Sequence, residues 1–426
     1  MADPTPSPPD VLIVGAGLAG LCCGRRLAEC DVPFRILEAS DGVGGRVRTD
    51  LVDGFRLDRG FQVYLTAFPE GRRVLDLDVL DLKTFAHAAL VWFGGRFHRI
   101  ADPRSEPLAA ARSLFNPVGS VRDKLRLVRL FWEIDRGALD RQLARDERLT
   151  LDLLRWNGRF TPAMIDRLFR PLCGAVLLEK QLSTSSRFFR FVFRMFAEGA
   201  AAVPAHGMQA IPDQIAARLT PGAVRLEARV IHVGSREVVL EGGETIRARA
   251  VVVATDGSAA AKLLGDELPD PGSHGSVTLY YAADRPPVSE PVVMLDGEGE
   301  GPVNHAAVLS NVSPAYAPAG KALIAASVVG IPADDDAELD RRARLQLSGW
   351  FGGAALGWRL LRAYRVPHAL PDQTAGKLDP WQRPVRLRPG LYVCGDHRDN
   401  GTIDGAMSSG FRAAQAVMED LESRQT

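Results

Sequence analysis

The sequence lacks an excess of charge of either sign, because its 426 residues include 52 Lys or Arg and 52 Asp or Glu. Nucleic-acid-binding domains are generally basic, so this balance argues against nucleic acid as a partner. No apolar run reaches the roughly 18 to 20 residues that a membrane-spanning helix needs, and no basic leader precedes an apolar stretch, as in a secretory signal. We therefore expect a cytoplasmic protein whose contact with a membrane, if any, is peripheral.

Cysteine and histidine are scarce and scattered. The five cysteines form no CxxC pair and the eight histidines do not cluster, so we expect neither a disulfide framework nor a metal site. The sequence also contains no GxSxG, HExxH or P-loop lysine motif. These absences leave two glycine-rich motifs and a third, C-terminal one as the main evidence for function.

The first glycine-rich motif follows the apolar run "VLIV" at residues 11–14 and precedes a helical stretch that extends to about Glu29. Such a run suits a strand buried on both faces of a parallel sheet. In this GxGxxG context the first glycine permits a tight turn, the second lets the backbone approach a pyrophosphate, and the third lets the helix pack on the strand. The candidate dinucleotide-binding residues are Gly15, Gly17, Leu18, Ala19 and Gly20.

Glu38 ends a second predicted strand, at residues 33–37. Its spacing from the glycine motif is that of an acidic residue that accepts hydrogen bonds from the hydroxyl groups of an adenosine ribose. Glu38 and the adjacent Ala39 are therefore candidates for cofactor binding. A carboxylate here disfavours a 2′-phosphate and argues against NADP, whereas NAD and FAD both remain possible from these residues alone.

A second glycine-rich loop, "DGVGGRVRT" at residues 41–49, favours FAD. A short NAD-binding unit does not need this loop, whereas a longer dinucleotide that carries an isoalloxazine ring does. The segments "VGAGLAGL" and "LEASDGVGGRVRT" resemble the opening of the flavin-containing amine oxidase superfamily, which includes monoamine oxidases, protoporphyrinogen oxidases and phytoene-type desaturases. The resemblance implies bound FAD, with Gly44, Gly45 and Arg46 at its diphosphate and flavin.

The resemblance also implies cofactor contacts at three later segments. They are an Asp-x-Gly turn beside the ring, a strand whose valine holds the adenine, and a C-terminal strand that ends in Gly-Asp and leads into a helix aimed at the flavin. Cys394 precedes the Gly-Asp pair and does not match the family's covalent cysteine, so we expect FAD to be noncovalent. Asp404 departs from the family pattern, and we expect it to cap a helix or face away from the ring. The implied contacts are Gly60, Phe61, Gln62, Val230, Gly395, Asp396, Thr402, Ile403 and Ala406.

The predicted fold class is α/β, with a discontinuous Rossmann-like FAD-binding domain and an α+β substrate domain that has an antiparallel sheet and a helical part. Residues 86–100 read as a hairpin in the substrate domain. The expected boundaries are a disordered lead-in at residues 1–9, an FAD-binding domain at 10–70, 203–270 and 385–426, and a substrate-binding domain at 71–202 and 271–384.

Three features are candidates for the substrate region. Tyr64 follows the Asp-x-Gly turn and is either a substrate contact or a core tyrosine. His305 interrupts a predicted strand and is either a group above the flavin or an edge-strand histidine. The segment 187–196, "RFFRFVFRMF", places its arginines on one helical face, and it is a half-buried helix, a wall of an apolar tunnel or a membrane-contacting helix.

Three functions are compatible with these features. The first is oxidation of a C–N or C–C bond by an FAD-dependent oxidoreductase that acts on a small molecule such as an amine or porphyrinogen, with oxygen or a quinone as acceptor. The second is desaturation or isomerisation of an apolar isoprenoid or carotenoid-type lipid. The third is a non-catalytic binding protein on the same fold. Lys321 lies in a predicted turn, "AYAPAGKAL", and not mid-strand where many amine oxidases of this superfamily keep a lysine, which weakens the amine hypothesis.

Overall fold

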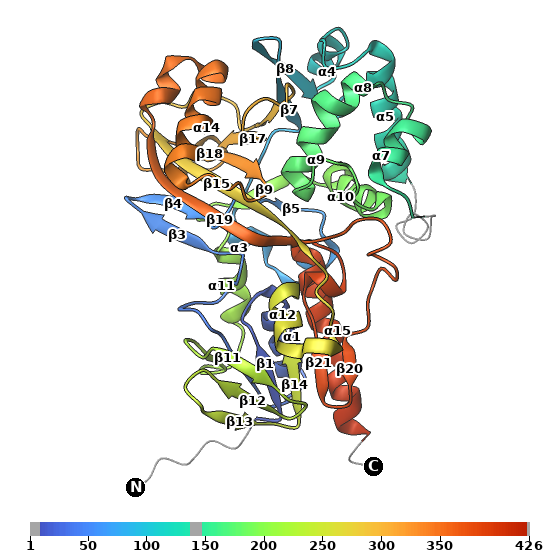
Figure 1. Ribbon diagram of the computed structural model, residues 1–426, viewed down its shortest axis with the longest axis vertical. Coiled ribbons are helices and arrows are strands. Elements are labelled where there is room, and N and C mark those ends of the chain that lie inside the picture. Colours follow the sequence, from blue (N-terminus) through green and yellow to red (C-terminus); the bar gives the residue numbers. More distant parts are fainter. Residues whose placement is uncertain (1–8, 137–146, 424–426) are drawn as a thin grey trace.

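The structure, a computed structural model, describes residues 9–136 and 147–423. The expected lead-in at residues 1–9 lies outside the described residues, apart from residue 9. The molecule is elongated, and a separate sheet lies toward each end (Figure 1). Among the described residues, no helix is both long and apolar enough to cross a bilayer.

A six-stranded sheet at one end is assembled from segments that lie far apart in the sequence. Neighbouring strands pair in parallel except at one edge, where β20 is antiparallel to β21. Parallel neighbours need a crossover connection, which explains why the chain leaves this sheet and returns to it. In spatial order the strands are β10 (Val224–Arg225), β2 (Phe34–Leu37), β1 (Val11–Val14), β14 (Ala250–Val253), β21 (Leu391–Val393) and β20 (Arg386–Arg388).

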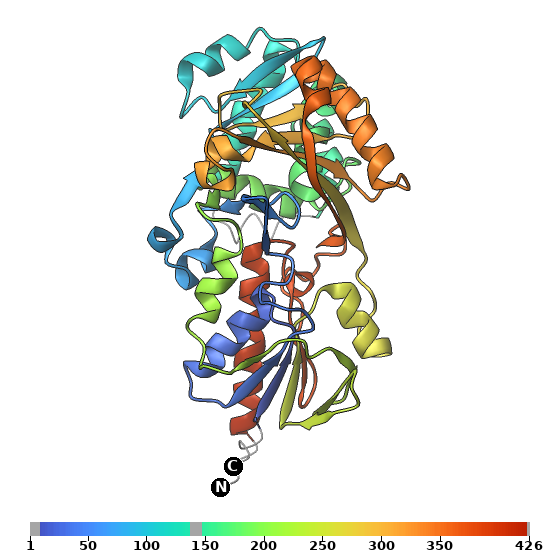
Figure 2. The same cartoon turned by 90° about the vertical axis from the view of Figure 1, so that its left-hand side faces the viewer.

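Both faces of this sheet are covered, which accounts for the continuous apolar run of β1. Val11 and Ile13 pack with the helices on one face, and Leu12 and Val14 pack with a helix and a small sheet on the other. Figure 2 shows the two sides of the sheet. The covering elements are α1 (Leu18–Ala28) and α15 (Ile403–Glu422) on one side, and α12 (Gly257–Leu264), β11 (Val230–Val233), β12 (Glu237–Leu240) and β13 (Thr245–Arg247) on the other.

A seven-stranded sheet forms the second half of the molecule. All of its neighbouring pairs are antiparallel except β16 and β7, which are parallel. Helix α14 (Asp336–Phe351) packs Leu339, Ala343 and Leu347 against one face of the sheet. The strands in order are β19 (Arg359–Pro371), β15 (Ser273–Ala283), β18 (Ala322–Val329), β17 (His305–Val308), β16 (Val293–Asp296), β7 (Ala88–Phe93) and β8 (Arg96–Ala101).

Helices gather at the end of the molecule farthest from the six-stranded sheet (Figure 1). The predicted hairpin at 86–100 is the β7–β8 pair, and the predicted helix at 187–196 is α10, so both predictions are confirmed. The helices of this group are α4 (Pro107–Ser113), α5 (Val121–Arg136), α7 (Thr150–Asp152), α8 (Pro162–Met164), α9 (Arg170–Leu177) and α10 (Ser186–Glu198), with π-helical turns η1 (Leu153–Asn157) and η2 (Ile165–Phe169).

The remaining short strands and helices belong neither to the two large sheets, with the elements that cover them, nor to this group of helices. Three of them form a small sheet in which β9 pairs with β5 on one side and β6 on the other. They are β3 (Thr49–Val52), β4 (Phe55–Asp58), β5 (Tyr64–Leu65), β6 (Leu82–Thr84), β9 (Ala201–Pro204), α2 (Pro69–Val74), α3 (Leu77–Leu80), α11 (Ala210–Ala216), α13 (Leu309–Val312), and the 3-10 turns η3 (Gly265–Glu267), η4 (Pro314–Tyr316), η5 (Gly353–Gly357) and η6 (Asp396–Arg398).

Candidate active site

The first glycine motif forms the turn between β1 and α1. Gly15 has φ +106°, a conformation that residues with a side chain rarely adopt. A Cβ on Gly20 would collide with the carbonyl oxygen of Gly15, so this position keeps the helix close to the turn. A Cβ on Gly17 would meet nothing within 4 Å, because this glycine borders a cavity. The turn therefore leaves backbone exposed where a ligand can approach it, beside the free N–H groups of the N-terminus of α1.

Glu38 lies at the carboxyl end of β2, beside this turn. Its Oε2 accepts a hydrogen bond from the Ala16 amide at 2.7 Å, and its Oε1 accepts from the amide and hydroxyl of Ser40 at 2.8 and 2.7 Å. A carboxylate has about four acceptor sites, so three bonds fix the orientation of the group and leave capacity for a ligand hydroxyl. Glu38 also lines the cavity.

The second glycine loop lies directly against the first. Gly44 forms a parallel bridge with Gly17, and its amide donates to the Ala16 carbonyl at 2.8 Å. Arg46 leaves this loop, and its Nη2 lies 2.7 Å from Oδ2 of Asp396. Although burial opposes it, the charge of Asp396 and the hydrogen bond to it raise the pKa of Arg46 above its usual value. The two loops and the C-terminal Gly-Asp pair thus meet at one place.

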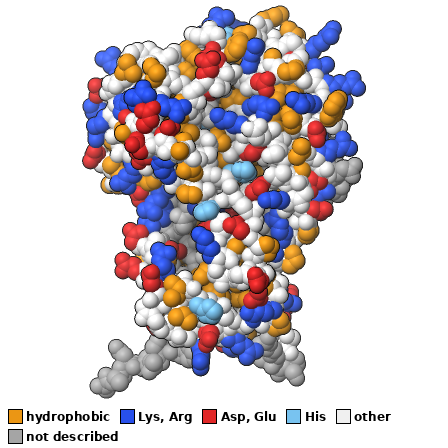
Figure 3. Space-filling view, viewed as in Figure 1, with side chains coloured by type: hydrophobic (Ala, Val, Ile, Leu, Met, Phe, Trp, Pro, Cys, Tyr) orange, Lys and Arg blue, Asp and Glu red, His pale blue; other side chains and the backbone are white. Residues whose placement is uncertain are grey.

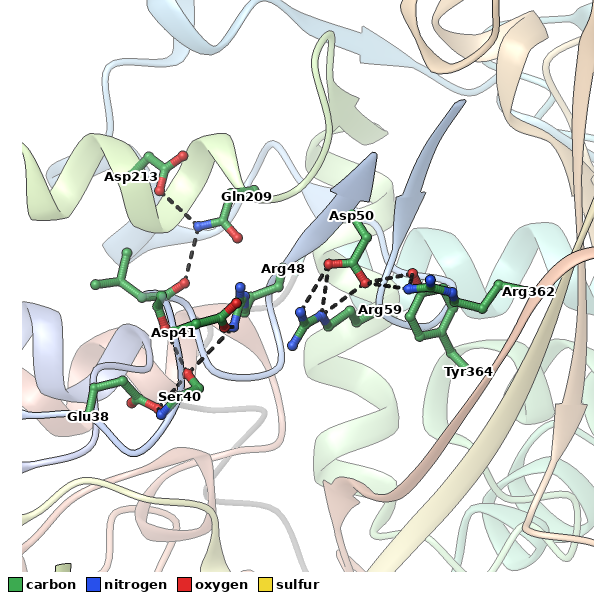
Figure 4. A network of polar contacts seen from close by, with 12 residues as sticks. Glu38, Ser40, Asp41, Arg48, Asp50, Arg59, Gln209, Asp213, Arg362 and Tyr364 are labelled. Carbon is green, nitrogen blue, oxygen red and sulfur yellow. Dashed lines mark hydrogen bonds and ion pairs between the residues drawn. The ribbon is translucent and has the colours of Figure 1, made fainter. Parts of the chain in front are cut away.

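A network of polar contacts holds the chain that follows the second loop (Figure 4). Arg48 pairs with Asp41 at 2.8 Å. Asp50 accepts from Arg59 at 3.0 Å and from the hydroxyl of Tyr364 at 2.7 Å. Tyr364 belongs to β19 of the seven-stranded sheet, so its bond to Asp50 ties the chain directly after the second glycine loop to the other half of the molecule.

The turn at residues 58–62 is fixed by polar groups from β3, from η4 and from the loop before α11. Asp58 is 1% exposed and accepts from Thr49, from the Met208 amide and from the hydroxyl of Tyr316. Burial raises the pKa of Asp58 to about 6, although these hydrogen bonds oppose the shift. Because Asp58 is buried and does not line the cavity, its hydrogen bonds serve to hold the turn in place.

The C-terminal motif is the third segment of the site. Gly395 has φ +148° and donates its amide to Ser409 Oγ at 2.9 Å. Thr402 is the N-cap of α15, with Oγ1 accepting from the Gly405 amide at 3.0 Å. Asp404 accepts from the amides of two α2 residues, Glu70 at 2.7 Å and Gly71 at 3.2 Å. The expectation that Asp404 caps a helix is therefore confirmed, because its Oδ1 accepts from two amides in the first turn of α2.

One continuous cavity of about 1080 Å³ begins at these loops and extends into the helical end of the molecule. It brings together residues from both glycine motifs, the Asp-x-Gly turn and the C-terminal strand. Of the residues expected at the cofactor, those that line the cavity are Gly15, Gly17, Leu18, Ala19, Glu38, Ala39, Gly44, Gly45, Arg46, Gly60, Phe61, Gln62, Gly395, Asp396, Thr402, Ile403 and Ala406.

Four expected site residues do not line the cavity. Gly20 lies behind the first turn, and Val230 lies in β11 next to Arg229, which does line the cavity. Tyr64 is fully buried, with its hydroxyl against Gly71 of α2, while its neighbours on either side face the cavity. We therefore correct the expectation that Tyr64 contacts substrate.

His305 also lies outside the cavity, buried behind Phe61 with ring centroids 5.1 Å apart. Its Nδ1 is 3.1 Å from Asn304 Nδ2, and burial, with a smaller effect of Lys180, lowers its pKa to about 3. A neutral histidine in this position packs against Phe61 and does not line the cavity, so the expectation that it lies above the flavin is corrected as well.

The part of the cavity beyond the glycine loops is lined mainly by apolar side chains from α4, α5, α9 and α10. The tunnel-wall interpretation of α10 describes its position, because one face of this helix borders the cavity and most of its other residues are buried. Lys124 also lines it, but its ammonium donates to the carbonyls of Asn116 and Gly119, both at 2.6 Å. The apolar lining residues from these helices include Ala110, Ala111, Leu125, Leu127, Val128, Phe131, Leu172, Ala175, Val176, Phe188, Val192, Phe193 and Phe196.

Sequence reasoning missed a segment directly after β14. Ala254, Thr255 and Asp256 line the cavity beside the first glycine turn. The apolar run "AVVV" could have indicated this segment, because ligands of open parallel sheets bind at the carboxyl ends of the strands. Among the described residues, no group of three or more His, Cys, Asp or Glu could hold a metal.

A dinucleotide turn, a second glycine loop and a helix N-terminus around one apolar cavity define a flavin-dependent oxidoreductase. The sequence profile of the flavin-containing amine oxidoreductases matches residues 18–418, and the chain belongs to this family. It is 26% identical to hydroxysqualene dehydroxylase of Rhodopseudomonas palustris over 96% of this chain and 98% of that protein. It is 42% identical to putrescine oxidase of Kocuria rosea, over 18% of this chain and 16% of that one.

Solved structures share the fold. Cyclohexylamine oxidase of Brevibacterium oxydans superposes with a TM-score of 0.72 at 17% identity, over 97% of this chain and all of that one. An oxidoreductase of Methanosarcina mazei superposes with a TM-score of 0.71 at 17% identity, over 96% of this chain and 99% of that one.

Proposed function

We propose that this protein is an oxidoreductase with noncovalently bound FAD, and that its substrate is a long apolar molecule of isoprenoid type. The expected domains are part of this proposal: residues 10–70, 203–270 and 385–426 bind the cofactor, and 71–202 and 271–384 bind the substrate. The acceptor is oxygen or a quinone.

The residues at the glycine loops fit FAD. Glu38 would accept from the ribose, the amides at the N-terminus of α1 would hold the diphosphate, and Asp396 would accept from the ribityl chain. The N-terminus of α15, which borders the cavity, carries a partial positive charge that favours negative charge on a ring edge near it. The chemistry that FAD supplies when bound is acceptance of a hydride equivalent from the substrate.

The distribution of carboxylates around the cavity is the main support for the proposed substrate class. An amine substrate that binds as an ammonium ion needs an anionic partner, since a buried ammonium without one is costly. Of the described carboxylates that line the cavity, Glu38, Asp256 and Asp396 lie at the glycine loops. The fourth, Asp102, pairs with Arg104, with Nη2 and Oδ2 2.6 Å apart. The apolar half therefore suits a hydrocarbon chain, and the full-length similarity to a hydroxysqualene dehydroxylase supports this class.

Anaerobic reduction of the bound flavin tests the proposal directly. The purified protein should show a flavin absorbance spectrum and release FAD on denaturation. Squalene-like alcohols and carotenoid precursors in detergent should bleach the flavin, whereas putrescine and porphyrinogens should not. Bleaching by amines alone would contradict the proposed substrate class and favour C–N oxidation, and release of FMN on denaturation would contradict the proposed cofactor.

A further inference from the structure

Helix α5 has two apolar faces, one that is buried in the core and one that is exposed. Val121, Leu125, Val128 and Trp132 recur at the i, i+4, i+7 and i+11 positions of one helical face, and their exposed fractions are 42, 59, 46 and 54%. The opposite face packs into the core, where Leu130 and Ile134 are buried. The packing of this buried face leaves Val121, Leu125 and Val128 exposed on the other side of the helix.

Two further exposed apolar residues belong to α4 and to the loop after it. Leu108 is 77% exposed and Phe115 is 85% exposed, and Figure 1 places α4 and α5 together at the end of the molecule farthest from the six-stranded sheet. Three residues of the stripe also line the cavity, which therefore reaches the surface here. We name this surface the apolar mouth, and it comprises Leu108, Phe115, Val121, Leu125, Val128 and Trp132.

Exposed arginines lie beside the apolar mouth although the whole chain is neutral. Between residues 104 and 134 the sequence holds six Lys or Arg and three Asp or Glu. Asp123 and Lys124 are buried, and Glu106 and Glu133 each pair with an arginine. Arg104, Arg126 and Arg129 likewise pair with carboxylates. Arg112 and Arg122 are exposed beside the apolar residues, and Figure 3 shows Lys and Arg side chains among hydrophobic ones at this end.

We propose that the apolar mouth docks onto the surface of an anionic lipid bilayer, so that an apolar substrate passes from the bilayer into the cavity. This inference rests on the proposed substrate class. Exposed apolar residues on an amphipathic helix bind the boundary between headgroups and acyl chains, and arginines near an anionic leaflet add to the attraction. A second copy of this chain suits the surface less well, because a symmetric contact would bring the same arginines together.

Vesicle flotation tests the docking. The flavin-loaded protein is mixed with phosphatidylcholine vesicles with or without phosphatidylglycerol, at low and high salt. Wild type should bind the anionic vesicles, and salt should weaken the binding. The double variant Leu108→Ser/Phe115→Ser, whose residues do not line the cavity, should bind about 100-fold more weakly. Arg112→Gln/Arg122→Gln should lose roughly fivefold per arginine on anionic vesicles only.

The matched control is Leu345→Ser/Leu356→Ser, because these two leucines are 64 and 56% exposed but belong to α14 and η5. The control should bind as wild type does. Failure of wild type to bind either vesicle, or equal weakening of the control, would overturn the proposal. A dimer in sedimentation without vesicles that the Leu108/Phe115 variant dissociates would also overturn it, by assigning the surface to a second copy. Flotation uses no substrate, and flavin reduction by detergent-dispersed isoprenoids uses no vesicles. A failure of membrane docking can therefore be distinguished from a failure of the proposed substrate class.

Discussion

Nη2 of Arg46 lies 2.7 Å from Oδ2 of Asp396, and this ion pair joins the second glycine loop to the C-terminal Gly-Asp pair. Asp396 is 5% exposed and Arg46 is about one third exposed at the cavity. A partly buried pair of this kind is sensitive to the loss of one partner, because the other charge is then left without compensation. The two motifs, at opposite ends of the sequence, therefore behave as one binding element.

Asp396→Asn should weaken FAD binding about tenfold or more. The amide keeps the shape of the side chain but loses the charge that pairs with Arg46, and hydrogen bonds to charged groups contribute about 1.5–3 kcal/mol. Fluorescence titration of the apoprotein with FAD measures the affinity. Glu267→Gln is the control, because it breaks an exposed pair with Arg388 far from the cavity and should leave the affinity unchanged. Equal affinity of Asp396→Asn and wild type would show that Asp396 does not hold the cofactor.

Gly410→Ala should destabilise the protein by a few kcal/mol. A Cβ on Gly410 of α15 would collide with the carbonyl oxygen of Ala19 in α1, so the two helices must separate next to the first glycine turn. Chemical denaturation followed by far-UV circular dichroism should show the loss. Gly349→Ala in α14 is the control, because a Cβ there meets nothing within 4 Å and alanine should add about 0.5–1 kcal/mol. A destabilisation that is equal in both variants would contradict the contact argument.

The cofactor half of the site could be predicted because its signals are local. Gly15, Gly17 and Glu38 are recognised by a strand before them, a helix after them and a fixed spacing, and all three line the cavity. Tyr64 could not be placed in this way, because its orientation depends on α2 packing beside it, while residues 63 and 65 face the cavity. The walls of the apolar half come from helices at separate places in the sequence, so no single motif marks them.

Asp404→Asn should change how the stability of the protein depends on pH. Burial raises the pKa of Asp404 to about 7 from the ordinary 3.8, although the amides of Gly71 and Glu70 oppose the shift. The folded state therefore binds the proton of Asp404 more tightly than the unfolded chain does. This proton binding stabilises the folded state at acidic pH, and the stabilisation is lost as pH rises toward 7. Asparagine can still accept from both amides but does not titrate. Its stability relative to wild type should thus rise between pH 5 and pH 8, by at most about 1.4 kcal/mol per pKa unit.

Thermal and urea unfolding of the flavin-loaded protein at several pH values measures this difference. Asp123→Asn is the matched control, because burial opposes but hydrogen bonds from Thr161 and Ser120 lower the pKa of Asp123. That carboxylate contributes stability above its unfolded pKa, and the contribution is lost only as pH falls through its lower folded pKa. The control should therefore be less stable than wild type by a constant amount from pH 5 to pH 8. A constant difference for Asp404→Asn as well would contradict a raised pKa at this site.

Ala175→Trp should narrow the apolar half of the cavity and so discriminate between substrates by length. Ala175 belongs to α9 and lines the cavity, and an indole ring projecting from this position would occupy space that a long hydrocarbon chain needs. The value of kcat/KM for a long isoprenoid substrate should fall tenfold or more, since lost apolar contact is worth about 0.8 kcal/mol per CH₂ group. A short analogue that reaches only the glycine loops should react as it does with wild type.

The flavin spectrum and the affinity for FAD separate this effect from misfolding, because both should stay unchanged in Ala175→Trp. Ala337→Trp on α14 makes the same substitution at an exposed helical position and should leave both substrates unaffected. Steady-state kinetics with the two substrates then isolates the cavity. If the long substrate reacts equally well with Ala175→Trp and wild type while FAD remains bound, the substrate does not occupy this part of the cavity, and the proposed apolar substrate class loses its structural basis.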